Sequence, residues 1–331
     1  MVPAREPWVL VLAGGDGRRL RELATDSSGI AVPKQYCSLC GGETLLQATL
    51  RRAQSISRRE RICAIVAAQH ECWWRGHRDQ FARGNLIVQP ENRGTANGIL
   101  LSALLIARRD RQATIVILPS DHHFMSEDRL TSAIRTALAD HHLRLGQAIL
   151  LGIAPDTADT SLGYILPSAP DGRVGSKAVS RFIEKPNAET ATHLLGAGAL
   201  WNSLIVIARV ATLLRLFERR LPGNLASIRS ALATERASAN RLVALARSYQ
   251  SLPHADFSRD VLEGEERSLR VQQVGHCGWS DLGTPQRIRQ VLGRLPRTLA
   301  STEDAPDWQR SGQGQSLNLE AQHTRLQAQG H

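Results

Sequence analysis

The chain has 331 residues, of which 42% are hydrophobic and 22% charged, and these proportions exclude a chain that is disordered throughout. Its net charge of +10 suits anionic ligands such as nucleotides or sugar phosphates. The arginines are scattered and no basic tract is interleaved with aromatic residues, so we expect no nucleic-acid partner.

Short aliphatic runs predict strands that are buried on both faces, and longer segments with apolar residues at helical spacing lie between and after them. The predicted strands are Trp8–Ala13, Ile62–Ala67, Leu86–Val88, Thr114–Leu118, Ala148–Ile153, Ala178–Ile183 and Leu204–Ile207. The predicted helices are Leu45–Ile56, Thr95–Arg109, Leu130–Leu143, Val210–Arg220 and Leu225–Leu252. This alternation predicts an α/β fold with a mostly parallel sheet flanked by helices.

The chain is expected to divide into three parts. Residues 1–222 would form the catalytic core, residues 223–300 a helical segment that completes the site, and residues 301–331 a polar tail whose composition predicts disorder. We find neither a cleavable leader nor a membrane span in the sequence, so we expect a cytoplasmic protein without a membrane partner. The five cysteines show CxxC spacing once, at Cys37 and Cys40, with no second pair, which favours incidental thiols over a zinc site.

A glycine-rich loop follows the first predicted strand. Its glycines Gly14, Gly15 and Gly17 would let backbone N–H groups approach a phosphate closely, and Arg19 adds charge. Pro33-Lys34-Gln35 lies downstream. The chain has 38 arginines and three lysines, two of which fall within motifs, so those positions favour a compact point charge.

Two further motifs lie at predicted strand ends. Gln89–Ala96 joins a strand to a helix, with Thr95 predicted as the helix N-cap. Leu118–His122 ends a buried strand, and a carboxylate such as Asp121 at the carboxyl end of a parallel strand points toward the ligand cleft of such folds. No set of His, Cys or Glu at fixed spacing supports a transition-metal site, so His122 and His123 are predicted to lie at the cleft edge.

The second half of the chain carries four more short motifs. They are Leu162-Gly163-Tyr164-Ile165, Arg181-Phe182-Ile183-Glu184-Lys185-Pro186, Ala199-Leu200-Trp201-Asn202-Ser203 and Gly278-Trp279-Ser280-Asp281-Leu282-Gly283. Taken singly, each has a structural explanation, such as an edge-strand tyrosine, a solvated Glu–Lys pair or an aspartate capping a turn.

Taken in order over residues 8–290, the motifs resemble those of the sugar-1-phosphate nucleotidylyltransferases, most of all the mannose-1-phosphate guanylyltransferases (GDP-mannose pyrophosphorylases). The chain departs from the family pattern at a twelve-residue spacer, residues 21–32, that lacks the usual Pro-Leu step. It also departs at Gly94 and Asn97 in the Arg-Asn-Thr-Ala-Pro stretch, and at Leu204, where the family has glycine.

The resemblance implies a Rossmann-like, GT-A-type fold and a role for each motif residue. Residues implied to bind nucleotide are Ala13, Gly14, Gly15, Gly17, Arg19, Lys34, Arg93, Gly94, Thr95 and Ser120. Residues implied to bind the sugar phosphate are Gly163, Tyr164, Glu184, Lys185 and Asn202. Asp121 and Asp281 would hold Mg²⁺, and these two act in catalysis with Arg19, Lys34 and Lys185.

The expected reaction joins a nucleoside triphosphate and a sugar 1-phosphate, with GTP and mannose 1-phosphate favoured. Glucose 1-phosphate with another nucleotide remains an alternative. Pro33–Tyr36 also resembles the methylerythritol-phosphate cytidylyltransferases, which lack the Glu-Lys-Pro and Trp-Asn-Ser motifs. A catalytically silent nucleotide-sugar-binding relative is the third alternative, and the sequence leaves the oligomeric state, including a homo-oligomer, open.

Overall fold

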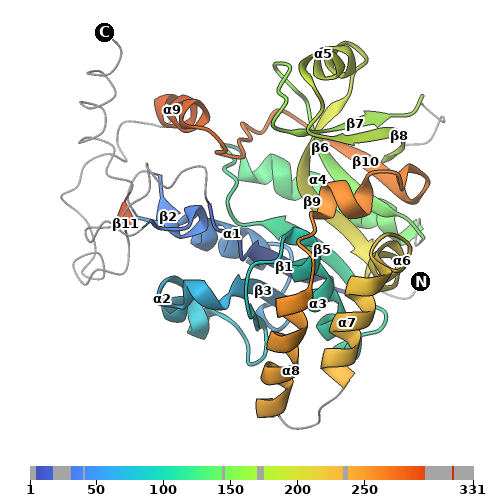
Figure 1. Cartoon of the computed structure of the whole chain (residues 1–331). Coiled ribbons are helices and arrows are strands. Elements are labelled where there is room, and N and C mark those ends of the chain that lie inside the picture. Colours follow the sequence, from blue (N-terminus) through green and yellow to red (C-terminus); the bar gives the residue numbers. More distant parts are fainter. Residues whose placement is uncertain are drawn as a thin grey trace.

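The computed structural model describes residues 5–17, 31–39, 42–143, 146–169, 175–233, 238–294 and 315–316 (Figure 1). Arg19, Cys40, residues 21–30 of the spacer and nearly all of the tail 301–331 lie outside these ranges. From the tail, β11 (Gln315–Ser316) pairs in parallel with β2 (Cys37–Ser38).

Within the described residues, nine strands form one mixed sheet in the order β4-β3-β1-β5-β9-β6-β10-β8-β7. Their bounds are β1 Trp8–Ala13, β3 Ile62–Ala67, β4 Leu86–Gln89, β5 Thr114–Pro119, β6 Ala148–Ile153, β7 Gly163–Pro167, β8 Lys177–Glu184, β9 Leu200–Arg209 and β10 Leu269–Val274. The strands β4, β3, β1 and β5 are parallel neighbours, as predicted.

The other half of the sheet is mixed, because β9 runs antiparallel to β5, β6 and β7. The aliphatic run at residues 204–207, from which this strand was predicted, did not indicate that β9 runs antiparallel to its neighbours. A strand covered on both faces has the same apolar pattern whichever way it runs.

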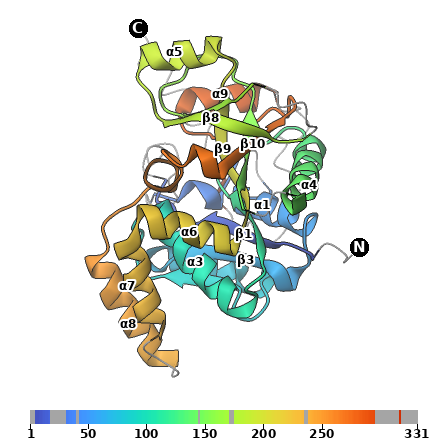
Figure 2. The same ribbon diagram turned by 90° about the vertical axis from the view of Figure 1, so that its right-hand side faces the viewer.

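Helices cover both faces of the sheet (Figures 1 and 2). Their bounds are α1 Leu45–Gln54, α2 Glu71–Trp74, α3 Thr95–Arg109, α4 Glu127–Leu143, α5 Ala188–Gly196, α6 Val210–Arg220, α7 Pro222–Ala233, α8 Ser238–Ser251 and α9 Pro285–Arg294. Short single turns also occur, of which Lys34–Tyr36 and Ser258–Leu262 lie near the site. Within the described residues, no helix combines the length and apolar character needed to cross a membrane.

The segment 223–300 differs from the helical segment expected there. The expected helix Leu225–Leu252 is two helices, α7 and α8, and the segment also supplies β10, which lies between β6 and β8. Arg270 and two glutamines interrupt the apolar pattern of β10, which is why the sequence did not indicate a strand there.

Strand β1 alternates its side chains between two hydrophobic cores. Trp8 and Leu10 join the core that contains α3, α6 and α7, whereas Val9 and Val11 join the core that contains α1 and α4. Burial of apolar surface on both faces contributes about 25 cal/mol per Å². The same packing places the ends of β1 and β5 side by side, with Leu12 in register with Pro119. The glycine loop and Asp121 therefore emerge next to each other.

Candidate active site

Three cavities adjoin one another at the ends of β1 and β5 from which the glycine loop and Asp121 emerge. The central cavity, of about 410 Å³, is lined by Asp16, Gly17, Lys34, Asn92, Asp121, His122, His254, Asp281, Leu282 and Gly283. A glycine-loop cavity of about 240 Å³ shares Asn92 and His254 with it. A third, the Glu184 cavity, has a volume of about 180 Å³ and shares His122 and Asp281 with it. The three form one continuous cleft.

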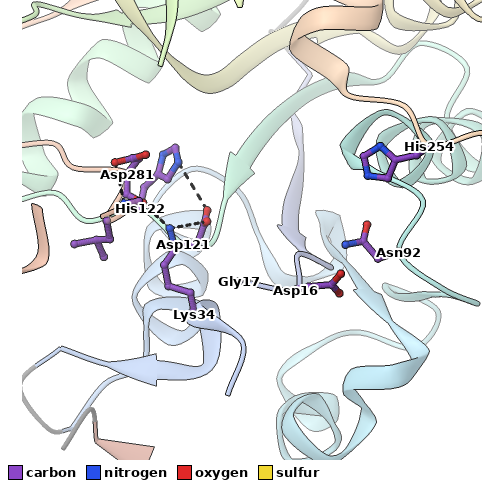
Figure 3. Close-up of a pocket in the computed structure, with 10 residues that line it drawn as sticks. Asp16, Gly17, Lys34, Asn92, Asp121, His122, His254 and Asp281 are labelled. Carbon is purple, nitrogen blue, oxygen red and sulfur yellow. Dashed lines mark hydrogen bonds and ion pairs between the residues drawn. The ribbon is translucent and has the colours of Figure 1, made fainter. Parts of the chain in front are cut away.

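Lys34 joins the two aspartates of the central cavity. Its Nζ lies 2.8 Å from Asp121 Oδ2 and donates a hydrogen bond to the backbone oxygen of Asp281. The Lys34 side chain is 11% exposed. Figure 3 shows these three residues grouped with His122, across the cavity from Asn92 and His254.

The turn Lys34–Tyr36 also holds the glycine loop. Gln35 Nε2 donates hydrogen bonds of 3.0 Å to the backbone oxygens of Ala13 and Gly15, and the Tyr36 hydroxyl donates to Ala13 O. The Pro-Lys-Gln motif therefore has two roles. Lys34 faces the central cavity, and Gln35 holds the glycine loop in place.

His122 links the two aspartate segments. Its Nδ1 accepts a hydrogen bond of 3.2 Å from Trp279 Nε1, and its Nε2 lies 3.7 Å from Asp121 Oδ1. Burial lowers the pKa of His122, although Asp121 opposes that shift, so the imidazole is neutral at pH 7. Burial by itself would raise the pKa of Asp121, but Lys34 and His122 outweigh it and hold that pKa below its usual value.

The donor set of the central cavity fits Mg²⁺. Asp281 Oδ1 accepts hydrogen bonds from Gly283 N and from Arg287, whereas Oδ2 accepts none from the described residues. Among the described residues, no group of three or more His, Cys, Asp or Glu is placed to hold a metal. Mg²⁺ binds one or two protein carboxylates and completes its shell with water and phosphate, and Asp121 and Asp281 could supply that number, although in this structure Lys34 engages Asp121 and Arg287 engages Asp281.

The glycine-loop cavity contains an unsatisfied amide. Gln89 is 3% exposed, and its Oε1 is buried without a hydrogen-bond partner in the described structure. Gly14, Gly15 and Gly94 line the same cavity. A buried acceptor without a partner is costly, so this atom is suited to receive an N–H donor from a ligand.

A segment from the second half of the chain closes this cavity. We call Pro253–Ser258 the strap. Gly94 has a φ of 90°, and a Cβ there would collide with the backbone oxygen of Ala255, so the approach requires glycine. Asn97 Nδ2 donates a 3.0 Å hydrogen bond to Pro253 O. Both departures from the family's Arg-Asn-Thr-Ala-Pro stretch therefore face the strap.

The prediction that Thr95 is the N-cap of α3 is wrong. The N-cap is Gly94, and Thr95 is the first helical residue. Thr95 Oγ1 instead accepts a 2.8 Å hydrogen bond from Phe257 N and lies 3.4 Å from Asp256 Oδ2. The hydroxyl is occupied by the strap, a long-range contact that local sequence did not reveal.

The Glu184 cavity gathers residues from all four motifs of the second half of the chain. Glu184 Oε1 lies 3.5 Å from Lys185 Nζ, and Asn202 Nδ2 donates a 3.1 Å hydrogen bond to Ser258 Oγ. A Cβ at Gly163 would collide with the Glu184 carboxylate. Burial, with the nearby Asp256 carboxylate, raises the pKa of Glu184 to about 6.

Three residues other than glycine have a positive φ within the described residues: Lys185 (51°), Leu204 (57°) and Leu282 (49°). Leu282 lines the central cavity, and Lys185 and Leu204 line the Glu184 cavity. Lys185 and Leu282 belong to the motifs, and Leu204 directly follows one. A left-handed conformation costs a side-chain-bearing residue about 1–2 kcal/mol. Backbone strain is thus concentrated at the cleft, as is common at functional sites.

The remaining predicted residues lie at its margin. Ser120 is buried, and its Oγ donates to Leu12 O, tying the ends of β1 and β5 together. Arg93 pairs with Glu91 at 2.7 Å. The Tyr164 side chain is fully buried and lines none of the three cavities, whereas its neighbour Gly163 lines the Glu184 cavity. Arg19 lies outside the described residues.

Residues of the cleft that were not singled out from the sequence include Gln89, Asn92, His254, Asp256 and Ser258, and Arg287 contacts the cleft residue Asp281. Gln89 begins the motif Gln89–Ala96, and its place in that motif was a usable signal. Asp256 and Ser258 belong to the strap, and Arg287 to α9. These three reach the cleft through tertiary contacts.

Comparison with known proteins identifies the class. The family model described as nucleotidyl transferase matches residues 8–296, and the chain belongs to this family. Mannose-1-phosphate guanylyltransferase of Escherichia coli K12 is 29% identical over 86% of this chain and 59% of its own length. The alginate biosynthesis protein AlgA of Pseudomonas syringae is 28% identical over 85% of this chain and 57% of its own.

The fold has a close counterpart among solved structures. The crystal structure described as mannose-1-phosphate geranyltransferase from Thermus thermophilus has a TM-score of 0.75 and 28% sequence identity, covering 88% of this chain and 81% of that one. The predicted α/β nucleotidyltransferase fold is thereby confirmed. The chain spans about three-fifths of the length of the curated relatives it matches.

Proposed function

We propose that the protein transfers a nucleotidyl group from a nucleoside triphosphate to a sugar 1-phosphate, with GTP and mannose 1-phosphate as the favoured pair and Mg²⁺ as the cofactor. The observation that carries this proposal is the position of Lys34, between Asp121 and Asp281, in the cavity that joins the glycine-loop cavity to the Glu184 cavity. The similarity to mannose-1-phosphate guanylyltransferases supports the choice of substrates.

The division of the cleft matches two anionic substrates. The nucleotide would occupy the glycine-loop cavity, with its phosphates extending toward Lys34. The sugar would occupy the Glu184 cavity, where Glu184 and Asn202 offer acceptors and donors to hydroxyl groups and Lys185 offers charge to the phosphate.

The reaction needs alignment more than proton transfer. An anionic phosphate oxygen of the sugar 1-phosphate attacks the α-phosphorus, the bond from that phosphorus to the bridging oxygen breaks, and pyrophosphate leaves. Holding the reactants in line contributes about 7–11 kcal/mol in favourable cases. Mg²⁺ held by Asp121 and Asp281 would supply charge stabilisation, and the Lys34 ammonium would neutralise charge on the phosphates.

Gln89 offers a contact to the base. Its unsatisfied Oε1 needs a donor, and guanine presents a ring N–H beside a carbonyl oxygen, to which a side-chain amide can make two hydrogen bonds. Uracil and thymine present a similar pair, and cytosine and adenine present an amino group beside a ring nitrogen that accepts. Gln89 therefore supports binding of a base, and the choice among bases rests on the similarity to the guanylyltransferases.

The test is a matrix of five nucleotides (ATP, CTP, GTP, UTP and dTTP) against mannose 1-phosphate, glucose 1-phosphate and methylerythritol phosphate, with Mg²⁺ and read as pyrophosphate release. We expect the highest kcat/KM for GTP with mannose 1-phosphate. A preference for CTP with methylerythritol phosphate would replace this proposal with the cytidylyltransferase. No turnover with any pair, together with tight binding of a nucleotide-sugar, would show a silent relative.

A further inference from the structure

Arg287 on α9 makes a three-way contact beside the cleft. One guanidinium nitrogen, Nη1, donates to Asp281 Oδ1, and the other, Nη2, donates to Asp159 Oδ2. Nη2 also donates a 3.1 Å hydrogen bond to Ser161 Oγ. The arginine side chain is 15% exposed, and with Asp159, Ser161 and Asp281 it lines a fourth cavity of about 460 Å³ beside the cleft.

The two carboxylates lie in distant parts of the chain. Asp281 lines both the central cavity and the Glu184 cavity, whereas Asp159 lines neither and lies with Ser161 in the loop between β6 and β7, shortly before Gly163. Ser161 and Gly163 both line the Glu184 cavity. One guanidinium therefore connects the Asp281 carboxylate to the loop that helps to shape the Glu184 cavity.

Hydrogen bonds hold the loop before Gly163 in place. Its contact with Arg287 can therefore fix the position of Asp281. Asp159 Oδ1 accepts hydrogen bonds from Ser161 N at 2.8 Å and Ser161 Oγ at 2.6 Å. Asp159 N donates a 2.7 Å hydrogen bond to the hydroxyl of Tyr164, which is fully buried. Arg287 thus ties Asp281 to a fixed point of the core.

The contact also sets which oxygen of Asp281 is available. Arg287 and Gly283 N both use Oδ1, and Gly283 N lies 3.0 Å away. Oδ2 accepts no hydrogen bond from the described residues and lies against Gly283, where a Cβ would collide with it, so its direction is fixed. A planar fork can hold two carboxylates at once, whereas an ammonium group on a flexible stem cannot reproduce that geometry.

We propose that Arg287 is a positioning residue that orients the Asp281 carboxylate for metal binding and couples it to the loop preceding the sugar-binding strand. This inference rests on the proposed function. Partners that orient metal ligands typically account for about 10–100-fold in metal affinity or activity. A lesser role, in which Arg287 merely anchors α9, would leave metal affinity unchanged in folded protein.

The test compares Arg287→Gln, Arg287→Lys and Asp159→Asn with a matched control, Arg289→Gln, an exposed arginine on the same helix. Mn²⁺ binding to the substrate-free protein is measured by electron paramagnetic resonance, after melting curves establish folding. We expect Arg287→Gln to weaken Mn²⁺ binding by about tenfold or more. Arg287→Lys should weaken it almost as much, and the control should stay within twofold of wild type.

Kinetics supply the second measurement. Arg287→Gln and Asp159→Asn should each raise the KM for the sugar 1-phosphate more than the KM for the nucleotide, and the double variant should be non-additive because one contact is removed twice. Wild-type Mn²⁺ affinity in folded Arg287→Gln, or no Mn²⁺ binding by the wild type, would overturn the inference. Failure of turnover in the wild type would instead reject the proposed function, since the Mn²⁺ comparison does not depend on turnover.

Discussion

His123 and Ser280 exchange two backbone hydrogen bonds of 2.9 Å, one in each direction, although they lie in distant parts of the chain. Asp121 lies two residues before one partner, and Asp281 directly follows the other. This small antiparallel bridge, reinforced by the Trp279–His122 hydrogen bond, is the physical reason that the two aspartates meet in one cavity.

Replacing Asp281 by asparagine should abolish Mg²⁺-dependent turnover without unfolding the protein. The amide can still accept the hydrogen bond from Gly283 N, but it lacks the charge that holds a divalent ion. We expect kcat to fall by more than the roughly 10–100-fold typical of losing an outer-shell partner. Asp156→Asn, at an exposed position, is the control. Near-normal activity of Asp281→Asn would remove this residue from the metal site.

Replacing Lys34 by methionine should strengthen Mn²⁺ binding to the substrate-free protein while lowering turnover. The ammonium lies inside the central cavity, 2.8 Å from Asp121, and competes with a metal cation for that carboxylate, whereas Arg287 contacts Asp281 without lining this cavity. Titration of Mn²⁺ into the variant, beside Lys177→Met as an exposed lysine control, measures the change. Weaker Mn²⁺ binding by Lys34→Met would show that the lysine supports the metal site instead of competing with it.

Replacing Lys185 by alanine should raise the KM for the sugar 1-phosphate by about tenfold, the scale of one charge-assisted contact, and leave the nucleotide KM nearly unchanged. Lys185 lines the Glu184 cavity and not the glycine-loop cavity. Initial rates with each substrate varied in turn separate the two constants. A shift confined to the nucleotide KM would contradict the assignment.

Glu184 should make stability depend on pH. Its folded pKa of about 6 exceeds the usual value, so the protonated form is favoured in the native state. The stability it contributes is present below about pH 4.5 and is lost as pH rises through about 6. The free energy of unfolding of Glu184→Gln relative to wild type should therefore rise by about 2 kcal/mol between pH 4 and pH 7. Urea unfolding at both pH values tests this, and a difference that is independent of pH would refute it.

At Leu204, glycine should be better tolerated than alanine. Leu204 has a φ of 57°, a conformation that costs any residue with a Cβ about 1–2 kcal/mol. Both substitutions remove the leucine side chain beyond Cβ, and only glycine also relieves the strain, so Leu204→Gly should be more stable than Leu204→Ala by about 1 kcal/mol. At an ordinary position the order is the reverse. Thermal melts of the two variants decide the matter.

Local patterns predicted much of the fold. The bounds of β1, β3, β6, α3 and α6 follow directly from aliphatic runs and helical spacing. The apolar pattern could not give the direction of β9, because a strand buried on both faces has the same pattern in either direction. It also missed β10, whose Arg270 is buried through contacts with Ser176. Resemblance placed Asp121 and Asp281 in one site, and both line the central cavity. Asp256 and Arg287 depend on contacts that no local pattern encodes.

The contact between Gly94 and Ala255 limits how this protein can be altered. An asparagine at position 94, as in the family pattern that the motif resembles, would have a side chain for which the strap leaves no room. We expect that substitution alone to displace the strap, which lines the glycine-loop cavity. A chimaera that replaces residue 94 would therefore need to replace the strap as well.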